Sequence, residues 1–287
     1  MKALAPGKIN LSLHLGEPRD DGLHELVSVV QAVSLADELT LEPVDGAADE
    51  VICPEVEGEN LAALALRSYR EATAWDGPPQ RLTIVKRIPI AGGMGGGSSD
   101  AAAALRLAAA AAGRPDDPAV ERLAPDLGAD VPALVRPGLK LVTGAGEHVR
   151  ALPDLDRFWV VVVTLPERLS TTDVFAEADR LRLPRPADEL HARARELETA
   201  LGGGGPLPDE ILHNDLEPAA RSLCPAIDVA LEALRAAGAE AAMVSGSGPT
   251  TFGVFRAWDD RVADVAASLA LDPRFADALV AFPAGAA

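Results

Sequence analysis

A glycine-rich stretch at residues 91–105, AGGMGGGSSDAAAAL, has the residue types that could bind a phosphate group. Glycine lacks a Cβ, so its backbone can take positive φ and lets an anion approach the N–H groups closely. Strong helix formers run from Asp100 to Ala112 and stop at Gly113. The unpaired N–H groups and the positive dipole end of such a helix face the loop, so the stretch predicts a phosphate site. The alternative is a flexible glycine turn that caps a structural helix.

Ser98 or Ser99 is the expected N-cap of that helix, which puts Asp100 in the first turn, where the dipole favours a carboxylate. The two serine hydroxyls also offer donors for a phosphate or ligands for its Mg²⁺. The chain has no P-loop pattern, no G-x-G-x-x-G dinucleotide pattern and no HRD or DFG signature of protein kinases. A nucleotide site in this chain therefore belongs to another class.

Composition and charge exclude several classes of partner. The 287 residues carry a formal net charge of −18, so the field of the molecule repels nucleic acid and anionic membranes. Cys53 and Cys224 lie far apart without metal-ligand spacing, which favours free thiols in a reducing cytoplasm. The first residues lack a signal-peptide pattern, and the longest apolar run, around 159–163, is far shorter than the ~20 residues of a membrane span. We expect a soluble cytoplasmic protein, with its oligomeric state left open.

The elements that must position this chemistry follow from periodicity. Ile9, Leu11, Leu13 and Leu15 alternate with polar residues, which predicts a half-buried strand with Lys8 and Asn10 on its polar face. Further strands are predicted over 26–34, 38–43, 81–88, 139–143, 158–165, 240–244, 250–255 and 276–282, and helices over 60–75, 100–112, 172–200, 225–237 and 259–270. We expect an α+β protein of two lobes, residues 1–150 with the glycine loop and residues 151–287, around a shared cleft.

Three stretches in this order resemble the GHMP small-molecule kinases: PGKINLSL at 6–13, the glycine loop at 92–99 and SGSGP at 245–249. Three more, DGLHEL at 21–26, GADVP at 128–132 and NDLEP at 214–218, resemble signatures of one branch of that superfamily. That branch uses ATP to phosphorylate the 2-hydroxyl of a cytidine-diphosphate-linked methylerythritol in the non-mevalonate isoprenoid route. The resemblance implies a two-lobed GHMP kinase fold with the active site in the cleft, ATP and Mg²⁺ as cofactors, and a C-terminal lobe that binds the substrate.

Lys8 and Asp130 match the catalytic pair of the family. The resemblance implies that Asp130 accepts the proton of the substrate hydroxyl or prepares it electrostatically. Lys8 then keeps that carboxylate ionised and stabilises charge on the moving phosphoryl group. The alternatives are a turn residue before Pro132 and a solvated strand end.

The remaining site residues are also carried over from the family. For ATP they are Gly92, Gly93, Gly95, Gly96, Gly97, Ser98 and Ser99 around the phosphates, with Asn60 and Lys86 near the adenine. Asn60 serves equally well as an N-cap and Lys86 as an exposed strand residue. For the substrate they are Asn10, Leu23, His24, Thr171, Phe175, Ser247 and Gly248. The SGSGP segment could instead be a tight turn between strands.

His24 corresponds to the residue that reads the cytosine edge, because an imidazole can offer both a donor and an acceptor. Leu23 stands where the family usually has a tyrosine that stacks on cytosine, and Phe175 matches the aromatic on the other face of the base. The base sandwich is therefore half aliphatic. No residue is assigned as a metal ligand: His14, His148, His191 and His213 have no metal spacing, and direct protein ligands of Mg²⁺ are left open.

Two other functions compete with this one. A homoserine or sugar kinase of the same superfamily is disfavoured by DGLHEL and NDLEP. A nucleotide-binding regulator without catalysis is disfavoured by the presence of Lys8, Asp130, Ser98 and Ser99, since a sensor has no need of a transfer base.

Overall fold

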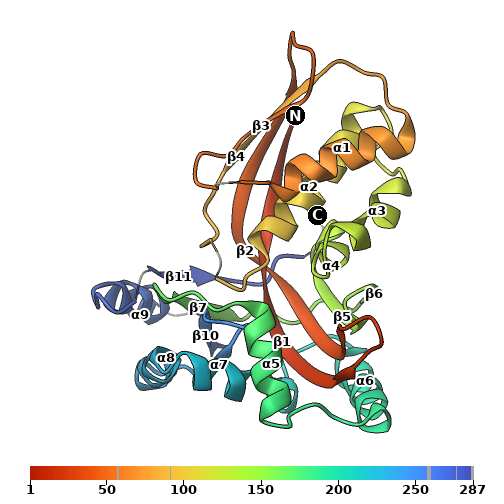
Figure 1. The fold of residues 1–287 in the computed structure, drawn as a ribbon. Helices are drawn as coiled ribbons and strands as arrows, with labels where there is room; N and C mark the ends of the chain where they lie inside the picture. Colours follow the sequence, from red (N-terminus) through yellow and green to blue (C-terminus); the bar gives the residue numbers. More distant parts are fainter. Residues whose placement is uncertain (57, 91, 257–259, 276, 286–287) are drawn as a thin grey trace.

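The computed structural model describes residues 1–56, 58–90, 92–256, 260–275 and 277–285. Ala91 of the glycine-rich stretch and residues 259 and 276, the expected first residues of the last helix and the last strand, lie outside the described residues. The backbone is built on two long strands, β1 (Lys2–Pro18) and β2 (His24–Pro43), which pair antiparallel and run through most of the molecule in Figure 1. The strands predicted over 26–34 and 38–43 are therefore a single strand.

The remaining strands are β3 (Glu50–Ile52), β4 (Gln80–Val85), β5 (Leu139–Gly144), β6 (His148–Ala151), β7 (Trp159–Thr164), β8 (His213–Asn214), β9 (Ala241–Val244), β10 (Thr251–Phe255) and β11 (Asp277–Ala281). Within the described ranges they form a seven-stranded sheet, β3-β4-β2-β1-β8 with β5 on β2 and β6 on β5, and a four-stranded sheet, β11-β7-β10-β9. The valine-rich β7 is buried almost throughout, as its continuous apolar run predicts.

The helices are α1 (Leu61–Thr73), α2 (Gly96–Ala111), α3 (Ala119–Leu127), α4 (Val131–Val135), α5 (Thr171–Arg180), α6 (Ala187–Leu201), α7 (Glu217–Leu223), α8 (Ala226–Ala236) and α9 (Asp260–Ala270). α2 packs on β1 and against α1, and its alanine face is buried there. α6 packs on β1 and β2, whereas α8 and α9 pack on strands of the smaller sheet. No helix in the described part of the chain is long and apolar enough to cross a membrane.

Two predictions about helices are wrong. The helix predicted over 172–200 is two helices, α5 and α6, because Arg182 takes a left-handed φ of 59° and Pro184 and Pro186 follow it. The N-cap of α2 is neither Ser98 nor Ser99 but Gly95, which has a φ of 66°. Asp100 therefore lies beyond the first turn of α2.

The polar face of β1 is buried rather than solvated. Lys8, Asn10, Ser12 and His14 are all less than a tenth exposed, although the alternation predicts a half-buried strand. The pairing of β1 with β2 shifts register between Pro6 and Lys8 and again between Asn10 and Ser12. Such irregularities re-aim side chains, and they flank the two residues that the sequence places at the reaction centre.

Candidate functional site

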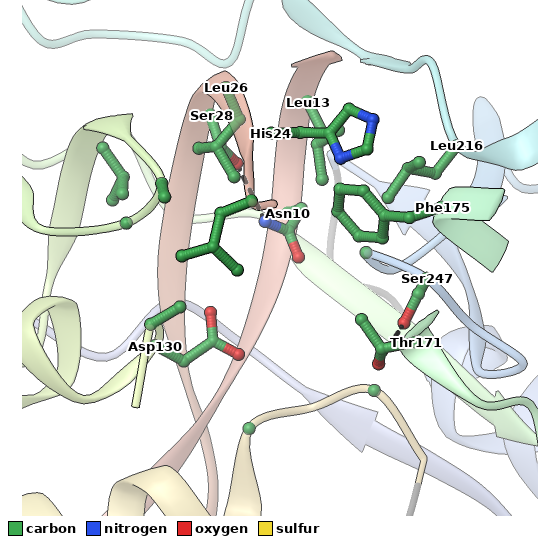
Figure 2. Close-up of a pocket in the computed structure, with 18 of the residues that line it drawn as sticks. Asn10, Leu13, His24, Leu26, Ser28, Asp130, Thr171, Phe175, Leu216 and Ser247 are labelled. Atoms are coloured by element: carbon green, nitrogen blue, oxygen red, sulfur yellow. Dashed lines mark hydrogen bonds between the residues drawn. The ribbon is translucent and has the colours of Figure 1, made fainter. Parts of the chain in front are cut away.

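A cavity of about 510 Å³ lies where β1 and β2 meet α5, the glycine loop and the segment after β9. Figure 2 shows Asp130 on one side of it, Thr171 and Ser247 on the other, and His24 with Phe175 at one end. Thr171 and Ser247 are joined by a hydrogen bond of 3.1 Å between their hydroxyls. Nearly all predicted substrate residues line this cavity: Asn10, Leu23, His24, Thr171, Phe175 and Ser247, together with Lys8 and Asp130.

A second cavity of about 370 Å³ adjoins the glycine loop. It is lined by the predicted nucleotide residues Asn60, Lys86, Gly92, Gly93, Gly95, Gly96, Gly97 and Ser98. Gly93 and Gly95 line both cavities. The glycine loop therefore separates two compartments, as required of a loop that holds the transferable phosphate of one ligand against the hydroxyl of another.

Lys8 and Asp130 come together at the rim of the first cavity. The Lys8 ammonium lies 3.5 Å from Asp130 Oδ2, and the side chain of Lys8 is buried while that of Asp130 is 42% exposed. The Lys8 ammonium also donates to Asn10 Oδ1 at 2.8 Å. Asn10 Nδ2 donates in turn to Ser28 Oγ, and Ser28 Oγ donates to the Ser12 carbonyl oxygen. Asn10 is thus oriented to hold the ammonium in place, and Ser28 is a supporting residue that the sequence reasoning missed.

The loops pack tightly against this pair. A Cβ at Gly95 would lie 3.1 Å from Lys8 Cγ, and one at Gly246 would lie 3.1 Å from Asn10 Oδ1 and 3.4 Å from Lys8 Nζ. Both glycines have positive φ. Only a residue without a side chain brings both loops into contact with Lys8 and Asn10.

His24 and Phe175 form the apolar end of the first cavity. Their ring centroids are 5.2 Å apart with an interplanar angle of 51°. His24 Nε2 lies 2.9 Å from Asp179 Oδ1, a partner on α5 that sequence reasoning missed. Leu23 lines the same cavity and is 55% exposed, so its apolar side chain is open to a ligand.

Lys86 is neither an exposed strand residue nor a free cation. Its ammonium donates to Asp37 Oδ2 and, at 2.7 Å, to Asp100 Oδ2, and all three side chains are buried. Burial raises the pKa of Asp100 to about 7, against the lowering effect of Lys86. Although burial lowers the pKa of Lys86, the hydrogen bonds to Asp100 and Asp37 raise it overall. The sequence gives no signal for Asp37, one of several carboxylates in the long strand β2.

Three predicted nucleotide or substrate residues have structural tasks. Ser99 is buried, its hydroxyl donates to the Pro6 carbonyl oxygen and its N–H donates to the Gly95 carbonyl, so it offers no free donor to a phosphate. Asn60 caps α1 by accepting from the Ala62 N–H, while still lining the second cavity. Gly248 lines neither cavity, and its carbonyl oxygen lies 3.0 Å from the position of a Cβ at Gly93.

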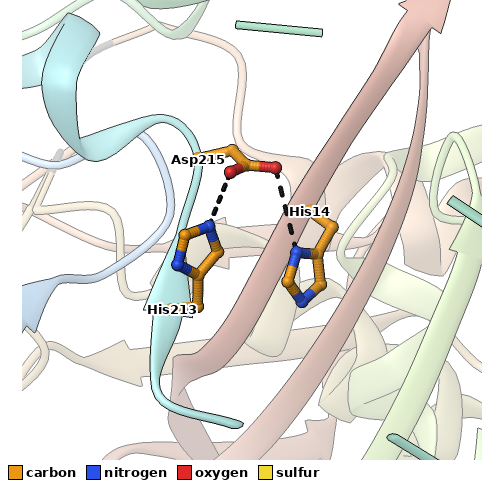
Figure 3. Close-up of side chains that lie close together, drawn as sticks. All are labelled: His14, His213 and Asp215. Atoms are coloured by element: carbon orange, nitrogen blue, oxygen red, sulfur yellow. Dashed lines mark hydrogen bonds and ion pairs between the residues drawn. The ribbon is translucent and has the colours of Figure 1, made fainter. Parts of the chain in front are cut away.

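His14, His213 and Asp215 lie close together, although the sequence shows no metal spacing for these histidines (Figure 3). The two imidazoles stack with centroids 4.9 Å apart, and His213 Nε2 lies 2.6 Å from Asp215 Oδ1. Arg185, however, donates to both Asp215 oxygens at 2.7 Å. The guanidinium of Arg185 neutralises the Asp215 carboxylate and would repel a metal cation. The cluster therefore fits a structural ion-pair network that joins β1, β8 and the α5–α6 link. Burial lowers the pKa of His14 to about 4.

Comparisons with known proteins identify the family of this chain. The family models described as GHMP kinases N terminal domain and GHMP kinases C terminal match residues 60–138 and 200–270. The 4-diphosphocytidyl-2-C-methyl-D-erythritol kinase of Mycolicibacterium gilvum is 42% identical over 262 residues, which cover 85% of this chain and 79% of the relative. The protein of that name from Streptomyces avermitilis is 40% identical, with coverage of 86% and 84%.

Solved structures give the same result. A crystal structure of 4-(cytidine 5'-diphospho)-2C-methyl-D-erythritol kinase matches with a TM-score of 0.79 and 32% identity over 99% of this chain and 100% of that one. A mevalonate kinase from L. major, at 18% identity and a TM-score of 0.72 over 100% and 97% of the chains, shares the fold. The predicted α+β GHMP kinase fold is confirmed. By identity and coverage, this chain belongs to the GHMP kinase family, in the branch of the 4-diphosphocytidyl-2-C-methyl-D-erythritol kinases.

Proposed function

We propose that this protein transfers the γ-phosphoryl group of ATP to the 2-hydroxyl of 4-diphosphocytidyl-2-C-methyl-D-erythritol, a step of the non-mevalonate route to isoprenoid precursors. The observation that carries the proposal is the glycine loop between two cavities, with Lys8 and Asp130 at the rim of one of them. Relatives at about 40% identity bear the name of this kinase. A cytoplasmic place of action fits the use of ATP.

In the proposed reaction, ATP occupies the cavity lined by Asn60 and Gly97, and its phosphates cross the glycine loop toward Lys8. The loop leads into the N-terminus of α2, where unpaired N–H groups and the helix dipole favour a phosphate. Ser98 supplies a hydroxyl at this cavity. The side chains of this cavity include Glu59, Lys86 and Asp100, so attraction for the phosphates comes from the backbone rather than from a surplus of cations.

Asp130 and Lys8 have different roles at the acceptor hydroxyl. The partly exposed Asp130 carboxylate accepts the hydroxyl proton, or orients it, as the oxygen attacks the γ-phosphorus. Lys8 lies beside that carboxylate and donates to the oxygens on which charge develops. The chain from Lys8 through Asn10 to Ser28 holds the ammonium in place before the substrate arrives.

Mg²⁺ is proposed as the ion that accompanies ATP. Mg²⁺ prefers oxygen ligands and usually takes one or two carboxylates besides phosphates and water. The nucleotide cavity offers the Ser98 hydroxyl and the carboxylates of Glu59 and Asp100, and Asp100 Oδ1 is buried without a partner in the described part of the chain. These oxygens fit the ion. When bound, it neutralises part of the phosphate charge.

The division into two lobes near residue 150 is likewise a proposal. The smaller sheet draws all of its strands from residues after 150, whereas the larger sheet draws all but β8 from residues up to Ala151. This supports an N-terminal lobe, 1–150, with the glycine loop and the catalytic pair. It supports a C-terminal lobe, 151–287, which contributes Thr171, Phe175 and Ser247 to the substrate cavity.

The test is an acceptor panel with purified protein and ATP. ADP release is followed with the cytidine-diphosphate-linked methylerythritol, with homoserine and with galactose, and ³¹P NMR identifies the new phosphomonoester. We expect turnover with the cytidyl acceptor alone. Asp130→Asn protein, purified in parallel, controls for a contaminating kinase. Faster turnover of homoserine or galactose would contradict the proposed substrate, and binding of ATP without turnover of any acceptor would support the regulator instead.

A further inference from the structure

We propose that Asp179 is a positioning residue that fixes the tautomer of His24 and thereby makes the cavity select cytosine over uracil. The inference rests on the proposed function, because it concerns how the same cavity chooses the base of its substrate. His24 is the only histidine among the residues that line this cavity in the described part of the chain, and Asp179 lines it as well.

The contact between the two side chains assigns the proton on the imidazole. His24 Nε2 and Asp179 Oδ1 are 2.9 Å apart, and the His24 side chain is 8% exposed. An ionised carboxylate can only accept, so Nε2 must donate the hydrogen bond. In the neutral ring the other nitrogen, Nδ1, then carries a lone pair and is an acceptor.

The remaining nitrogen is available to a ligand. No side chain or backbone group in the described part of the chain makes a hydrogen bond to His24 Nδ1, and this atom is not sealed from solvent. Phe175 packs beside the ring, so the imidazole is held on one side by an apolar contact and at Nε2 by the carboxylate. The ring therefore presents one defined acceptor at the base end of the cavity.

An acceptor at this place distinguishes the two pyrimidines. Cytosine linked through N1 has one donor group on its edge, the 4-amino group, whereas uracil has a carbonyl oxygen at position 4. Nδ1 can accept from the amino group of cytosine, but its lone pair faces the lone pairs of the uracil oxygen. Without Asp179 the ring can adopt the opposite tautomer, in which Nδ1 donates, and this tautomer matches uracil.

The first test compares two aspartates of α5. Asp179→Ala removes the acceptor at Nε2, and Asp173→Ala removes an exposed carboxylate from the first turn of the same helix without touching the cavity. Steady-state kinetics are measured with cytidine- and uridine-diphosphate-linked methylerythritol. We expect Asp179→Ala to lower the cytidine-to-uridine ratio of kcat/KM by about tenfold or more, mainly through KM for the cytidine substrate. Asp173→Ala should keep the wild-type ratio. An equal loss on both substrates in Asp179→Ala would overturn the inference.

The second test needs no turnover. Long-range ¹H–¹⁵N spectra of the ligand-free protein report the tautomer of each histidine, and His24→Gln identifies the signals of His24. We expect the Nε2-protonated pattern in the wild type and a mixture of tautomers in Asp179→Ala. An unchanged His24 pattern in that variant would overturn the positioning role. Failure of the wild type to phosphorylate the cytidine substrate would instead refute the proposed function, and the spectra would still decide the role of Asp179.

Discussion

At the scale of single residues, the Lys8 ammonium lies closer to a neutral partner, Asn10, than to the carboxylate of Asp130. The ammonium donates to Asn10 at 2.8 Å and lies 3.5 Å from Asp130. In the proposed reaction, a tight ion pair would occupy the carboxylate oxygen that receives the proton of the substrate hydroxyl. The looser contact leaves room for that hydroxyl beside the carboxylate.

We predict that Asp130→Asn and Lys8→Ala each lower kcat by about 10²–10⁴-fold while ATP binding stays nearly normal. Both side chains act on the acceptor hydroxyl and the moving charge, and neither belongs to the glycine loop. Rapid-quench kinetics give kcat, and calorimetry gives the Kd for ATP. Asp126→Asn, an exposed carboxylate on α3, is the matched control. Retained turnover in Asp130→Asn would leave positioning alone as the mechanism.

We predict that Leu23→Tyr lowers KM for the cytidyl substrate by up to about tenfold, a change of ~1.4 kcal/mol, with kcat nearly unchanged. Leu23 is an exposed apolar side chain in the same cavity as Phe175, and a tyrosine there would add a π-face that binds the base equally in the ground and transition states. Phe175→Ala should raise KM.

The control for this change is Leu4→Tyr, because Leu4 is also exposed, at 62%, but does not line the cavity. It should leave KM at the wild-type value. If KM moves in neither Leu23→Tyr nor Phe175→Ala, cytosine does not lie between these two side chains.

At the scale of elements, the glycine loop needs a left-handed backbone conformation at Gly95 and free space beside the backbone at Gly96. Gly95 has a φ of 66°, and a Cβ there would press on Lys8. Gly96 is already helical, and a Cβ there would lie 3.2 Å from Ile88 and 3.4 Å from Lys86 Nζ.

We predict that Gly95→Val abolishes ATP binding in a folded protein, measured by calorimetry. Gly113→Val is the matched control, because Gly113 has a φ of 74° with nothing within 4 Å. It should lower stability and keep ATP affinity; normal affinity in Gly95→Val would make the loop a mere turn.

The network of His14, His213, Asp215 and Arg185 predicts how stability depends on pH. Burial lowers the pKa of His14 to about 4, below the value near 6.5 of an unfolded chain. As the pH falls through this window, the unfolded state binds a proton that folded His14 does not. The free energy of unfolding therefore decreases by up to about 3 kcal/mol between pH 6.5 and 4 from this residue.

We predict that His14→Gln removes this pH-dependent loss, whatever its effect at pH 7. Urea unfolding at pH 7, 6 and 5 gives the slope, and the difference from the wild type isolates His14 from the other titrating groups. His148→Gln, at an exposed position on β6, should keep the wild-type slope. If the free energy of unfolding changes with pH in the same way in His14→Gln and in the wild type, the pKa of His14 is not lowered in the folded protein.

The sequence predicted those parts of the site that depend on local pattern, the glycine loop followed by a helix and the strand with Lys8 and Asn10. The gathering of Thr171, Phe175 and Ser247 at one cavity followed only from the resemblance to the GHMP kinases. Pairings between distant residues could not, because they follow from tertiary packing. Asp37 and Asp100 meet Lys86 across 49 and 14 residues of chain.

Two errors at element ends have a related cause. Serine is a good N-cap in general, but the chain enters α2 through a left-handed glycine, which shifts the start of the helix. The break between α5 and α6 lies in LRLPRP at 181–186, where the prolines were a signal that the apolar spacing of 172–200 outweighed.

At the scale of the whole molecule, the net negative charge of the protein repels a nucleotide that approaches the site. The chain has a formal net charge of −18, and the titratable side chains of the nucleotide cavity are one lysine and two carboxylates. The loop and the N-terminus of α2 act only at short range, because the effect of a helix dipole falls off within a turn. An approaching ATP therefore meets a repulsive field at long range and an attractive site at contact.

We predict that the association rate constant of a fluorescent ATP analogue rises several-fold when NaCl increases from about 10 to about 150 mM at constant free Mg²⁺. The Debye length shrinks from about 30 Å to about 8 Å over this range, which screens the distant acidic surface but not the groups in contact with the phosphates. Stopped-flow fluorescence measures the rate, and the matching adenosine analogue, which has no phosphate, should show no such rise. A rate constant that falls with salt would mean that cations near the cavity, Lys8 and Lys86 among them, dominate the field along the approach, and that the overall negative charge has no part in nucleotide capture.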